Sequence, residues 1–166
     1  VNKNTISNHI KEVKKECDFL IISFHWGKEF EYYPLQSQVK LVHLVVDSGG
    51  DIIIGHHPHI LQGVENYNGK FIFYSLGNFI FDRQIPKGTD ETIILTIKLK
   101  KNNISSTTNN ISTKEICIIP VEILNCQPAP AVEYKADYIL QRLKLYSTGM
   151  NTNFMIKNNK YILTLD

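Results

Sequence analysis

Three histidines lie within four consecutive positions in the segment Gly55-His56-His57-Pro58-His59. Imidazoles so close together are costly to bury, because every ring nitrogen needs a partner and protonation would place like charges side by side. A metal cation resolves both problems, and neutral imidazole is a common ligand for Zn, Mn and Fe. Pro58 favours an extended His57, and alternate residues of an extended segment share a face. We therefore predict that His57 and His59 chelate a metal while His56 points away; a solvated loop with incidental histidines is the alternative.

A further histidine, His25, follows the apolar run DFLIISF in the segment Phe24-His25-Trp26-Gly27. A histidine at the carboxyl end of a buried parallel strand projects into the crevice where ligands bind in open α/β sheets. Gly27 allows the backbone to turn close to whatever His25 contacts. Taken alone, the segment fits equally well a loop histidine that packs on Trp26. With the histidine cluster it makes His25 a third candidate ligand.

Polar residues that could contact a substrate follow the run FIFYS. Ser75 and Asn78 can donate hydrogen bonds to a phosphate or a carboxylate, and Arg83 could hold an anionic group with two hydrogen bonds. A simple turn around Asn78 and a surface ion pair of Arg83 are the alternatives. We predict Ser75, Asn78 and Arg83 as substrate-binding residues.

The first half of the sequence predicts alternating helices and strands. Residues 5–16 have apolar side chains at helical spacing, residues 18–24 form a short apolar strand, and a second helix opens at Pro34 and ends at Gly49-Gly50 before a strand at 51–55. This order is typical of a parallel sheet, in which ligands collect at the carboxyl ends of strands. Both histidine segments follow predicted strands, so we expect neighbouring buried strands that bring His25 close to His57 and His59.

The second half predicts antiparallel strands. We expect strands at 63–67 and 71–75, joined by an Asn68-Gly69 hairpin turn, and further strands at 92–100 and 111–124. The polar segment 102–110 is expected to be a disordered surface loop. Residues 132–146 predict a helix, and the tail 151–166 remains ambiguous. Residues 1–166 are expected to form a single unit of the α/β class, with parallel strands followed by antiparallel strands.

Composition and charge exclude several classes of protein. The 166 residues contain 43% hydrophobic residues and have a formal charge of +2 without a basic stripe, so no nucleic-acid partner is expected. Three cysteines without a CxxC pair suggest neither a disulfide framework nor a zinc knuckle. No apolar run approaches the roughly 20 residues of a membrane span. We expect the chain as given to be soluble and, since it begins with Val1, to be part of a longer protein.

The segments around the histidines resemble a known family. Residues 17–82, with DFLIISFHWGKEF and DIIIGHHPHILQGVENYNGKFIFYSLGNFIFD, are similar to the late part of the CapA family of bacterial capsule synthesis or poly-γ-glutamate biosynthesis proteins. The resemblance implies a calcineurin-like metallophosphoesterase fold, an αββα sandwich of which this chain is the C-terminal half, with two metals at the strand ends. His25 matches the family's single histidine, and His57 and His59 match its Gly-His-x-His pair. In the alternative register, which starts at Gly55, His56 is a ligand.

The resemblance also implies a function for the longer protein. Further ligands would precede residue 1, so we expect two divalent ions (Mn, Zn or Fe) in the full domain, one or none in this chain, and no activity of the chain alone. The implied role is that of a metal-dependent phosphoesterase-like protein in capsule or poly-γ-glutamate synthesis, membrane-attached and extracytoplasmic at the bacterial envelope. A non-catalytic envelope scaffold is the alternative. Expected partners are an anionic polymer or phosphoester substrate, other synthesis subunits, or further copies of the chain.

Overall fold

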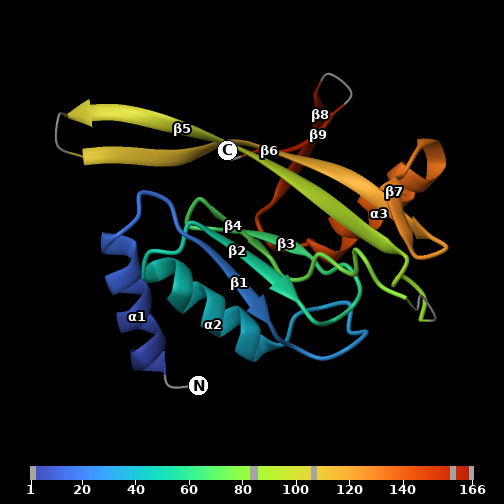
Figure 1. Ribbon diagram of the computed structural model, residues 1–166, viewed down its shortest axis with the longest axis horizontal. Coiled ribbons are helices and arrows are strands. Elements are labelled where there is room, and N and C mark those ends of the chain that lie inside the picture. The colour runs from blue at the N-terminus through green and yellow to red at the C-terminus, as the bar shows by residue number, and fades with distance from the viewer. Residues whose placement is uncertain (1–2, 83–85, 106–107, 158–159, 165–166) are drawn as a thin grey trace.

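The computed structural model describes residues 3–82, 86–105, 108–157 and 160–164. Helices and strands alternate in the first part of the chain, and strands dominate the second part (Figure 1). The elements are α1 Lys3–Lys15, β1 Ile21–His25, α2 Gln36–Asp47, β2 Ile52–His56, β3 Val64–Tyr67, β4 Lys70–Phe73, β5 Glu91–Ser105, β6 Thr108–Leu124, β7 Gln127–Pro130, α3 Glu133–Tyr146, β8 Asn153–Lys157 and β9 Lys160–Thr164. Among the helices so described, none is long and apolar enough to cross a membrane.

The first sheet has the strand order β1-β2-β4-β3. Strands β1, β2 and β4 run parallel, and β3 pairs with β4 antiparallel. The hairpin between β3 and β4 turns at Asn68 and Gly69, both of which have positive φ, as a two-residue turn of this kind requires. The predicted α/β class, with parallel strands followed by antiparallel ones, is confirmed, and it is compatible with a fragment of a metallophosphoesterase-like domain.

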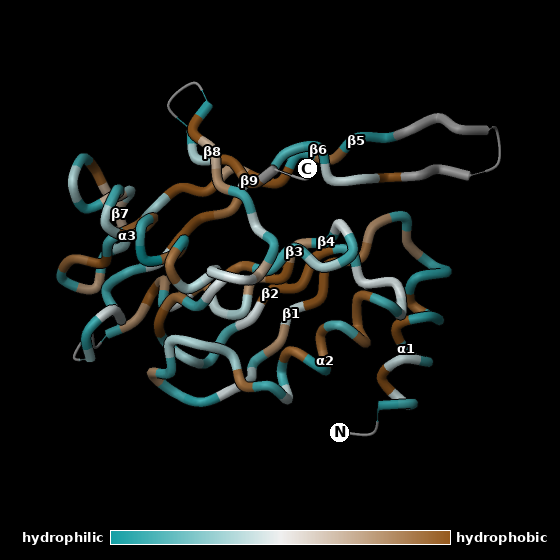
Figure 2. The backbone as a smooth tube through the Cα atoms, turned by 180° about the vertical axis from the view of Figure 1, so that it is seen from behind, coloured by the Kyte–Doolittle hydropathy of each residue, from teal (hydrophilic) through white to brown (hydrophobic). Residues whose placement is uncertain are grey.

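Helices cover one face of the first sheet and the second sheet covers the other (Figure 1). On the helical side, Ile53 and Ile72 pack with residues of α1 and α2 such as Ile10 and Val42. On the other side, Ile52 and its neighbours pack against residues of β5, β6, β9 and α3. The hydropathy colours follow this arrangement, with hydrophobic residues concentrated along the strands of the first sheet (Figure 2).

The second sheet is antiparallel, with the order β5-β6-β9-β8 and with β7 paired to β6. The prediction of a loop at 102–110 is wrong for the residues described there, because β5 continues to Ser105 and β6 begins at Thr108. Ladder hydrogen bonds join backbone groups, so two long paired strands can extend through a polar segment. The tail that the sequence left ambiguous forms the hairpin β8–β9.

Two details of the first elements differ from the prediction. β1 is the outer strand of its sheet within the described chain, and Ile21 is 48% exposed, so the expectation that β1 is buried on both faces is wrong. Helix α2 begins at Gln36, after Pro34, because Leu35 serves as its N-cap residue. The Leu35 N–H donates to Oε1 of Gln38 at 2.9 Å, which satisfies a backbone donor at the start of the helix.

Candidate metal centre

The carboxyl ends of β1 and β2 bring the two histidine segments together. The strands are direct neighbours, and His25 pairs with His56 at the end of the ladder. Beyond the ladder, Nε2 of His25 lies 3.1 Å from Nδ1 of His57, with ring centroids 4.7 Å apart. The expected proximity of the segments follows from the parallel pairing, because parallel neighbours end at the same edge of a sheet.

The loop after β2 is not extended, contrary to the prediction. His57 has φ +97° and His59 has φ +63°, so Pro58 does not hold His57 in an extended conformation. The chain instead turns at both histidines, and their ring centroids lie 5.9 Å apart. The two imidazoles share one site because the loop folds back on itself. They do not share it through the alternation of side chains along an extended strand, which was the predicted reason. Such positive φ values are uncommon outside glycine and mark a backbone held by its surroundings.

His56 occupies the last position of β2 and is half-buried. Burial, and after it the charge of His25, lower the pKa of His56, so the imidazole is held in its neutral form. His56 lines the same cleft as His25, His57 and His59. His56 therefore borders the site, whereas we expected it to point away, and it is not part of the group of donor atoms formed by Glu29, His57 and His59.

Asn78 fixes the orientation of His59. The amide nitrogen of Asn78 donates to the carbonyl oxygen of Thr89 at 3.2 Å, and a carbonyl can only accept. Oδ1 of Asn78 therefore faces Nδ1 of His59 at 2.8 Å, so Nδ1 carries the proton and donates it. This tautomer leaves the lone pair on Nε2 of His59 for a metal, as in metal sites where a neighbouring oxygen orients the ligand.

The other two residues predicted to bind substrate lie elsewhere. Ser75 is buried, and its hydroxyl accepts a hydrogen bond from the backbone N–H of Gly77 at 3.2 Å, which stabilises the turn after β4. Arg83 lies outside the described residues. Asn78 lines the cleft but directs its amide at His59 and Thr89. The structure thus gathers the three candidate ligands and uses Asn78 to orient one of them.

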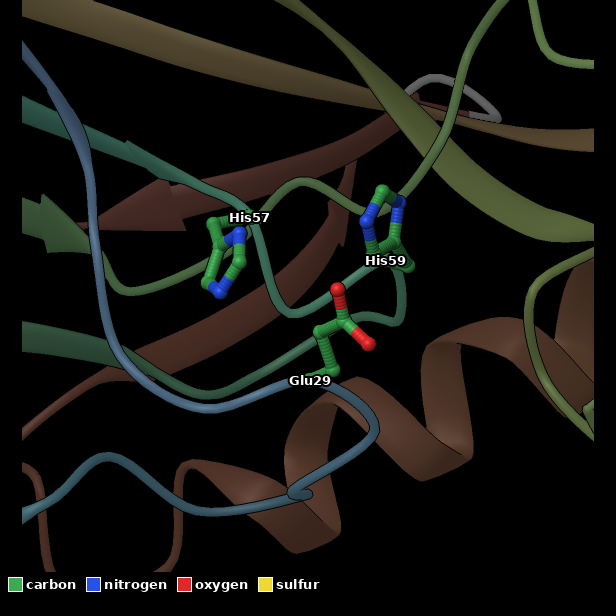
Figure 3. Close-up of side chains that lie close together, drawn as sticks. All are labelled: Glu29, His57 and His59. Carbon is green, nitrogen blue, oxygen red and sulfur yellow. The ribbon is translucent and has the colours of Figure 1, made fainter.

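Glu29 joins the histidines, although nothing in the sequence analysis singled it out. One donor atom each of Glu29, His57 and His59 lies within 4.8 Å of the others. The Glu29 carboxylate points from the loop after β1 toward the space between the two imidazoles (Figure 3). Its position four residues after His25 was the only available signal, and that signal is weak because the path of the loop decides where the carboxylate lies.

A tryptophan braces the end of β1. The indole of Trp26 stacks on Phe24 with ring centroids 4.8 Å apart, and its Nε1 donates to the carbonyl oxygen of Tyr74 at 3.0 Å. This hydrogen bond passes over Gly55, where an added Cβ would lie 2.0 Å from the Tyr74 oxygen and 2.6 Å from the indole nitrogen. Gly55 is therefore required for the hydrogen bond that holds Trp26 against Tyr74, the residue after β4.

Gly27 completes the turn after His25. Its φ is +89°, and an added Cβ would lie 2.9 Å from Nε2 of the buried Gln38. The turn is thus packed against the first turn of α2, and both glycines that flank the histidine segments have a structural reason.

The imidazoles open into a cleft of about 470 Å³. The four histidines at the strand ends form one side, and mostly apolar residues at 76–81 and 92–94 form the other. Phe79, Ile80 and Phe81 are exposed there, and the ring of Phe81 lies 5.1 Å from that of His59. The cleft therefore combines a polar donor set with an apolar wall, as ligand sites commonly do.

The donor set fits a divalent metal ion. Zn–N and Zn–O bonds of about 2.0–2.2 Å in tetrahedral geometry place the ligand atoms of one ion about 3.3–3.6 Å apart. The 3.1 Å between the facing nitrogens of His25 and His57 is slightly shorter than this spacing. The Glu29 group, whose donor atoms lie within 4.8 Å of one another, would have to close by a rotation of side chains to share one ion. Imidazole nitrogens with one carboxylate oxygen suit Zn, Mn or Fe.

Comparison with known proteins identifies the family. The family model "Bacterial capsule synthesis protein PGA_cap" matches residues 1–83, which is half of the 166 residues. The chain is 36% identical over 157 residues to the PGA biosynthesis protein CapA of Bacillus subtilis (strain 168), covering 95% of this chain and 38% of that protein. It is 36% identical over 121 residues to the capsule biosynthesis protein CapA of Bacillus anthracis, covering 72% of this chain and 27% of that protein.

A more distant match is a probable polyglutamine synthesis accessory protein of Mycobacterium tuberculosis, with 35% identity over 69 residues, 42% of this chain and 18% of that protein. The chain spans well under half the length of these relatives. The family match covers both histidine segments and the turn that contains Asn78. The chain belongs to the family of bacterial capsule synthesis proteins described by the PGA_cap model.

Proposed function

We propose that this chain is part of a protein of capsule or poly-γ-glutamate synthesis and that it provides the histidine part of a divalent metal site for phosphoester-type hydrolysis. The observation that carries the proposal is the convergence of His25, His57 and His59 at the ends of two neighbouring parallel strands. The names of the relatives, two CapA proteins and an accessory protein of polyglutamine synthesis, support the biological role.

The residues of the chain have separate roles in this proposal. His25, His57 and His59 would hold Zn, Mn or Fe, and Asn78 holds His59 in the tautomer that leaves Nε2 free. A bound divalent ion of this kind polarises a phosphoryl oxygen and lowers the pKa of water. The apolar side chains at 79–81 line one side of the cleft and could contact an apolar part of a substrate.

The partners and the location of the longer protein belong to the same proposal. We propose a phosphoester or an anionic polymer as substrate and other synthesis subunits as partners, since the relative from Mycobacterium tuberculosis is named an accessory protein. We also propose action at the bacterial envelope, outside the cytoplasm and attached to the membrane, where a capsule polymer is delivered. Two metals would occupy the full domain, with further ligands contributed by other parts of the longer protein.

A non-catalytic scaffold is the second candidate. Exposed apolar residues favour it, because Phe79, Ile80 and Phe81 beside the cleft and Ile21 on β1 form surfaces that suit a protein partner. The two candidates make different demands on the histidines. Catalysis needs the metal ligands, whereas a scaffold function would survive their replacement if the fold is kept.

The test is a calorimetric titration of the chain with zinc and with manganese. His57→Ala and His59→Ala should weaken binding at least about tenfold, a loss that even outer partners of metal ligands produce. His9, exposed on α1, provides the control, and His9→Ala should leave the affinity unchanged. Equal losses for His56→Ala and His57→Ala would move the ligand assignment to the alternative register. Loss of zinc from the His57→Ala, His59→Ala variant of the full-length protein supports the site if the chain alone does not bind, and full retention there would contradict it.

The enzyme and scaffold candidates are separated in the full-length protein. A metal-loaded preparation should hydrolyse a generic phosphoester, and the His57→Ala, His59→Ala double variant should lose this activity while it retains its circular dichroism spectrum. Polymer synthesis by cells that carry the double variant would favour the scaffold, and loss of polymer together with loss of hydrolysis would favour the enzyme.

A further inference from the structure

The Glu29 carboxylate lies close to two imidazoles without a direct bond to either. Its oxygen and the nearest nitrogens of His57 and His59 lie within 4.8 Å of one another. No hydrogen bond or ion pair of Glu29 is present among the described residues. The separation is thus too long for a direct hydrogen bond, and it exceeds by at most about 1.5 Å the spacing of ligands that share one tetrahedral cation, a difference that rotation of the exposed Glu29 side chain can close.

The loop that carries Glu29 is held against the histidine loop on both sides of this residue. The backbone N–H of Phe30 donates to the carbonyl oxygen of Pro58 at 2.9 Å. The side-chain nitrogen of Gln62, a residue only 1% exposed, donates to the backbone oxygen of Glu31 at 2.8 Å. These hydrogen bonds join the residues next to Glu29 to the turn that contains both imidazoles and to Gln62 after it. The backbone at Glu29 is therefore held in place beside the site.

The neighbouring carboxylate of Glu31 behaves differently. It forms a surface ion pair with Lys28 at 2.6 Å, which is the ordinary use of an exposed acidic side chain. Glu29, two residues away, faces the imidazoles instead (Figure 3). The loop therefore directs one of its two glutamates at the cation Lys28 and the other at two imidazoles, which can bind one cation together with a carboxylate.

We infer that Glu29 is a carboxylate ligand of a divalent cation that His57 and His59 also bind. This inference rests on the proposed metal site and adds to it a ligand that this chain supplies itself. Two imidazoles and one carboxylate form a mixed nitrogen and oxygen set that suits Zn, Mn or Fe(II) and leaves open positions for water or substrate. One ion would then bind to the chain alone, without ligands from the rest of the longer protein.

The experiment compares Glu29→Gln with Glu31→Gln in the 166-residue chain. Both glutamates belong to one loop and both changes keep the shape of the side chain, so circular dichroism should show intact folds. In calorimetric titrations with zinc, Glu29→Gln should weaken binding at least about tenfold and Glu31→Gln should not. With cobalt(II), the visible spectrum of Glu29→Gln should differ from that of the unmodified chain, because a carboxylate is lost from the coordination shell, and Glu31→Gln should match the unmodified chain.

The outcomes distinguish this inference from the proposal on which it rests. If Glu29→Gln binds zinc as the unmodified chain does and its cobalt spectrum is unchanged, while His57→Ala loses binding, Glu29 is not a ligand and the histidine site stands. If the unmodified chain binds neither zinc nor cobalt, the role of Glu29 is overturned, and the full-length variant described above decides on the histidine site. A one-to-one stoichiometry that Glu29→Gln retains only at tenfold higher metal concentration supports the assignment.

Discussion

The Nδ1 atom of His59 donates a hydrogen bond to Oδ1 of Asn78 over 2.8 Å. The direction of this bond follows from the hydrogen bond that the amide nitrogen of Asn78 makes. Because Nδ2 of Asn78 must donate to the Thr89 carbonyl, Oδ1 can only accept. A residue that a sequence reader would assign to a turn or to the substrate thus orients an imidazole. The proposed metal site therefore depends on a residue that need not touch the metal.

Replacement of Asn78 by alanine should lower zinc affinity about 10- to 100-fold, because His59 loses the acceptor that fixes its tautomer. The free energy of unfolding should also fall by about 1–3 kcal/mol, since the Thr89 carbonyl loses its donor in a buried place. Calorimetric titration and urea unfolding measure the two effects. Asn68→Ala, at a surface turn where the amide contacts Asp47, is the control for the zinc affinity. Unchanged zinc affinity of Asn78→Ala would contradict the orienting role.

Gly55→Ala should destabilise the fold by about 1–3 kcal/mol or more, because the new Cβ has no room beside the Tyr74 carbonyl and the indole of Trp26. Gly69→Ala is the matched control: no atom lies within 4 Å of its added Cβ, and its φ of +72° costs only about 1–2 kcal/mol. Urea unfolding gives both values, and the fluorescence of Trp26 should shift in Gly55→Ala alone. An unaltered tryptophan spectrum would show that the indole does not need the glycine.

Asp51 should make the stability of the protein depend on acid pH. Burial would raise the pKa of Asp51, but hydrogen bonds from Lys14, Lys70 and the Leu20 N–H outweigh it and hold the pKa below the ordinary 3.8. A folded-state pKa below the unfolded one means that the stabilisation is complete above about pH 3.8 and is lost as the pH falls through the folded-state value. Urea unfolding between pH 2 and pH 7 measures this loss.

The variant Asp51→Asn should be less stable at neutral pH by roughly 1.5–3 kcal/mol, since the amide cannot replace a charge bonded to two lysines. Its stability should change less below pH 4 than that of the unmodified chain. Asp18→Asn, at an exposed position, controls for a general loss of negative charge. Parallel pH curves for the unmodified chain and Asp51→Asn would mean that another carboxylate causes the acid sensitivity.

The outer strand β1 should make the isolated chain associate at high concentration. Ile21 is 48% exposed, and the outer edge of β1 has no paired strand among the described residues. Exposed apolar edges of this kind join other chains, and an inserted lysine prevents it. Sedimentation velocity should show a concentration-dependent oligomer for the unmodified chain, and Ile21→Lys should shift it to the monomer. A single monomeric species of the unmodified chain at every concentration would exclude this association.

Much of the first sheet was predictable from the sequence. The apolar runs before His25 and His56, with a helix between them, predict parallel strands, and the chemistry of parallel pairing places both histidine segments at one edge. The Asn68-Gly69 turn was predictable because both positions need positive φ. These features depend on the local pattern of apolar residues and on the residues of the turn, and both can be read from short stretches of sequence.

The long ribbon of β5 and β6 was less predictable. The sequence of its outer part is polar and has no apolar alternation to mark a strand, yet the backbone pairing continues past Lys100. The tail hairpin β8–β9 was ambiguous for a related reason, since its role depends on pairing with the distant β6. Pairing partners far apart in the chain leave little trace in the residues themselves.

The sequence by itself determined that His25, His57 and His59 follow predicted parallel strands, because the apolar runs, the helix between them and the histidine positions are local features of the chain. Only the tertiary structure decided that the loop folds back at two positive φ values, that Asn78 orients His59 and that Glu29 joins the group. These three features depend on contacts between segments far apart in the chain, such as the Phe30 N–H bond to the Pro58 carbonyl. The physical reason is that a side chain's direction is set by the path of its loop, and that path is fixed by packing and hydrogen bonds to distant residues.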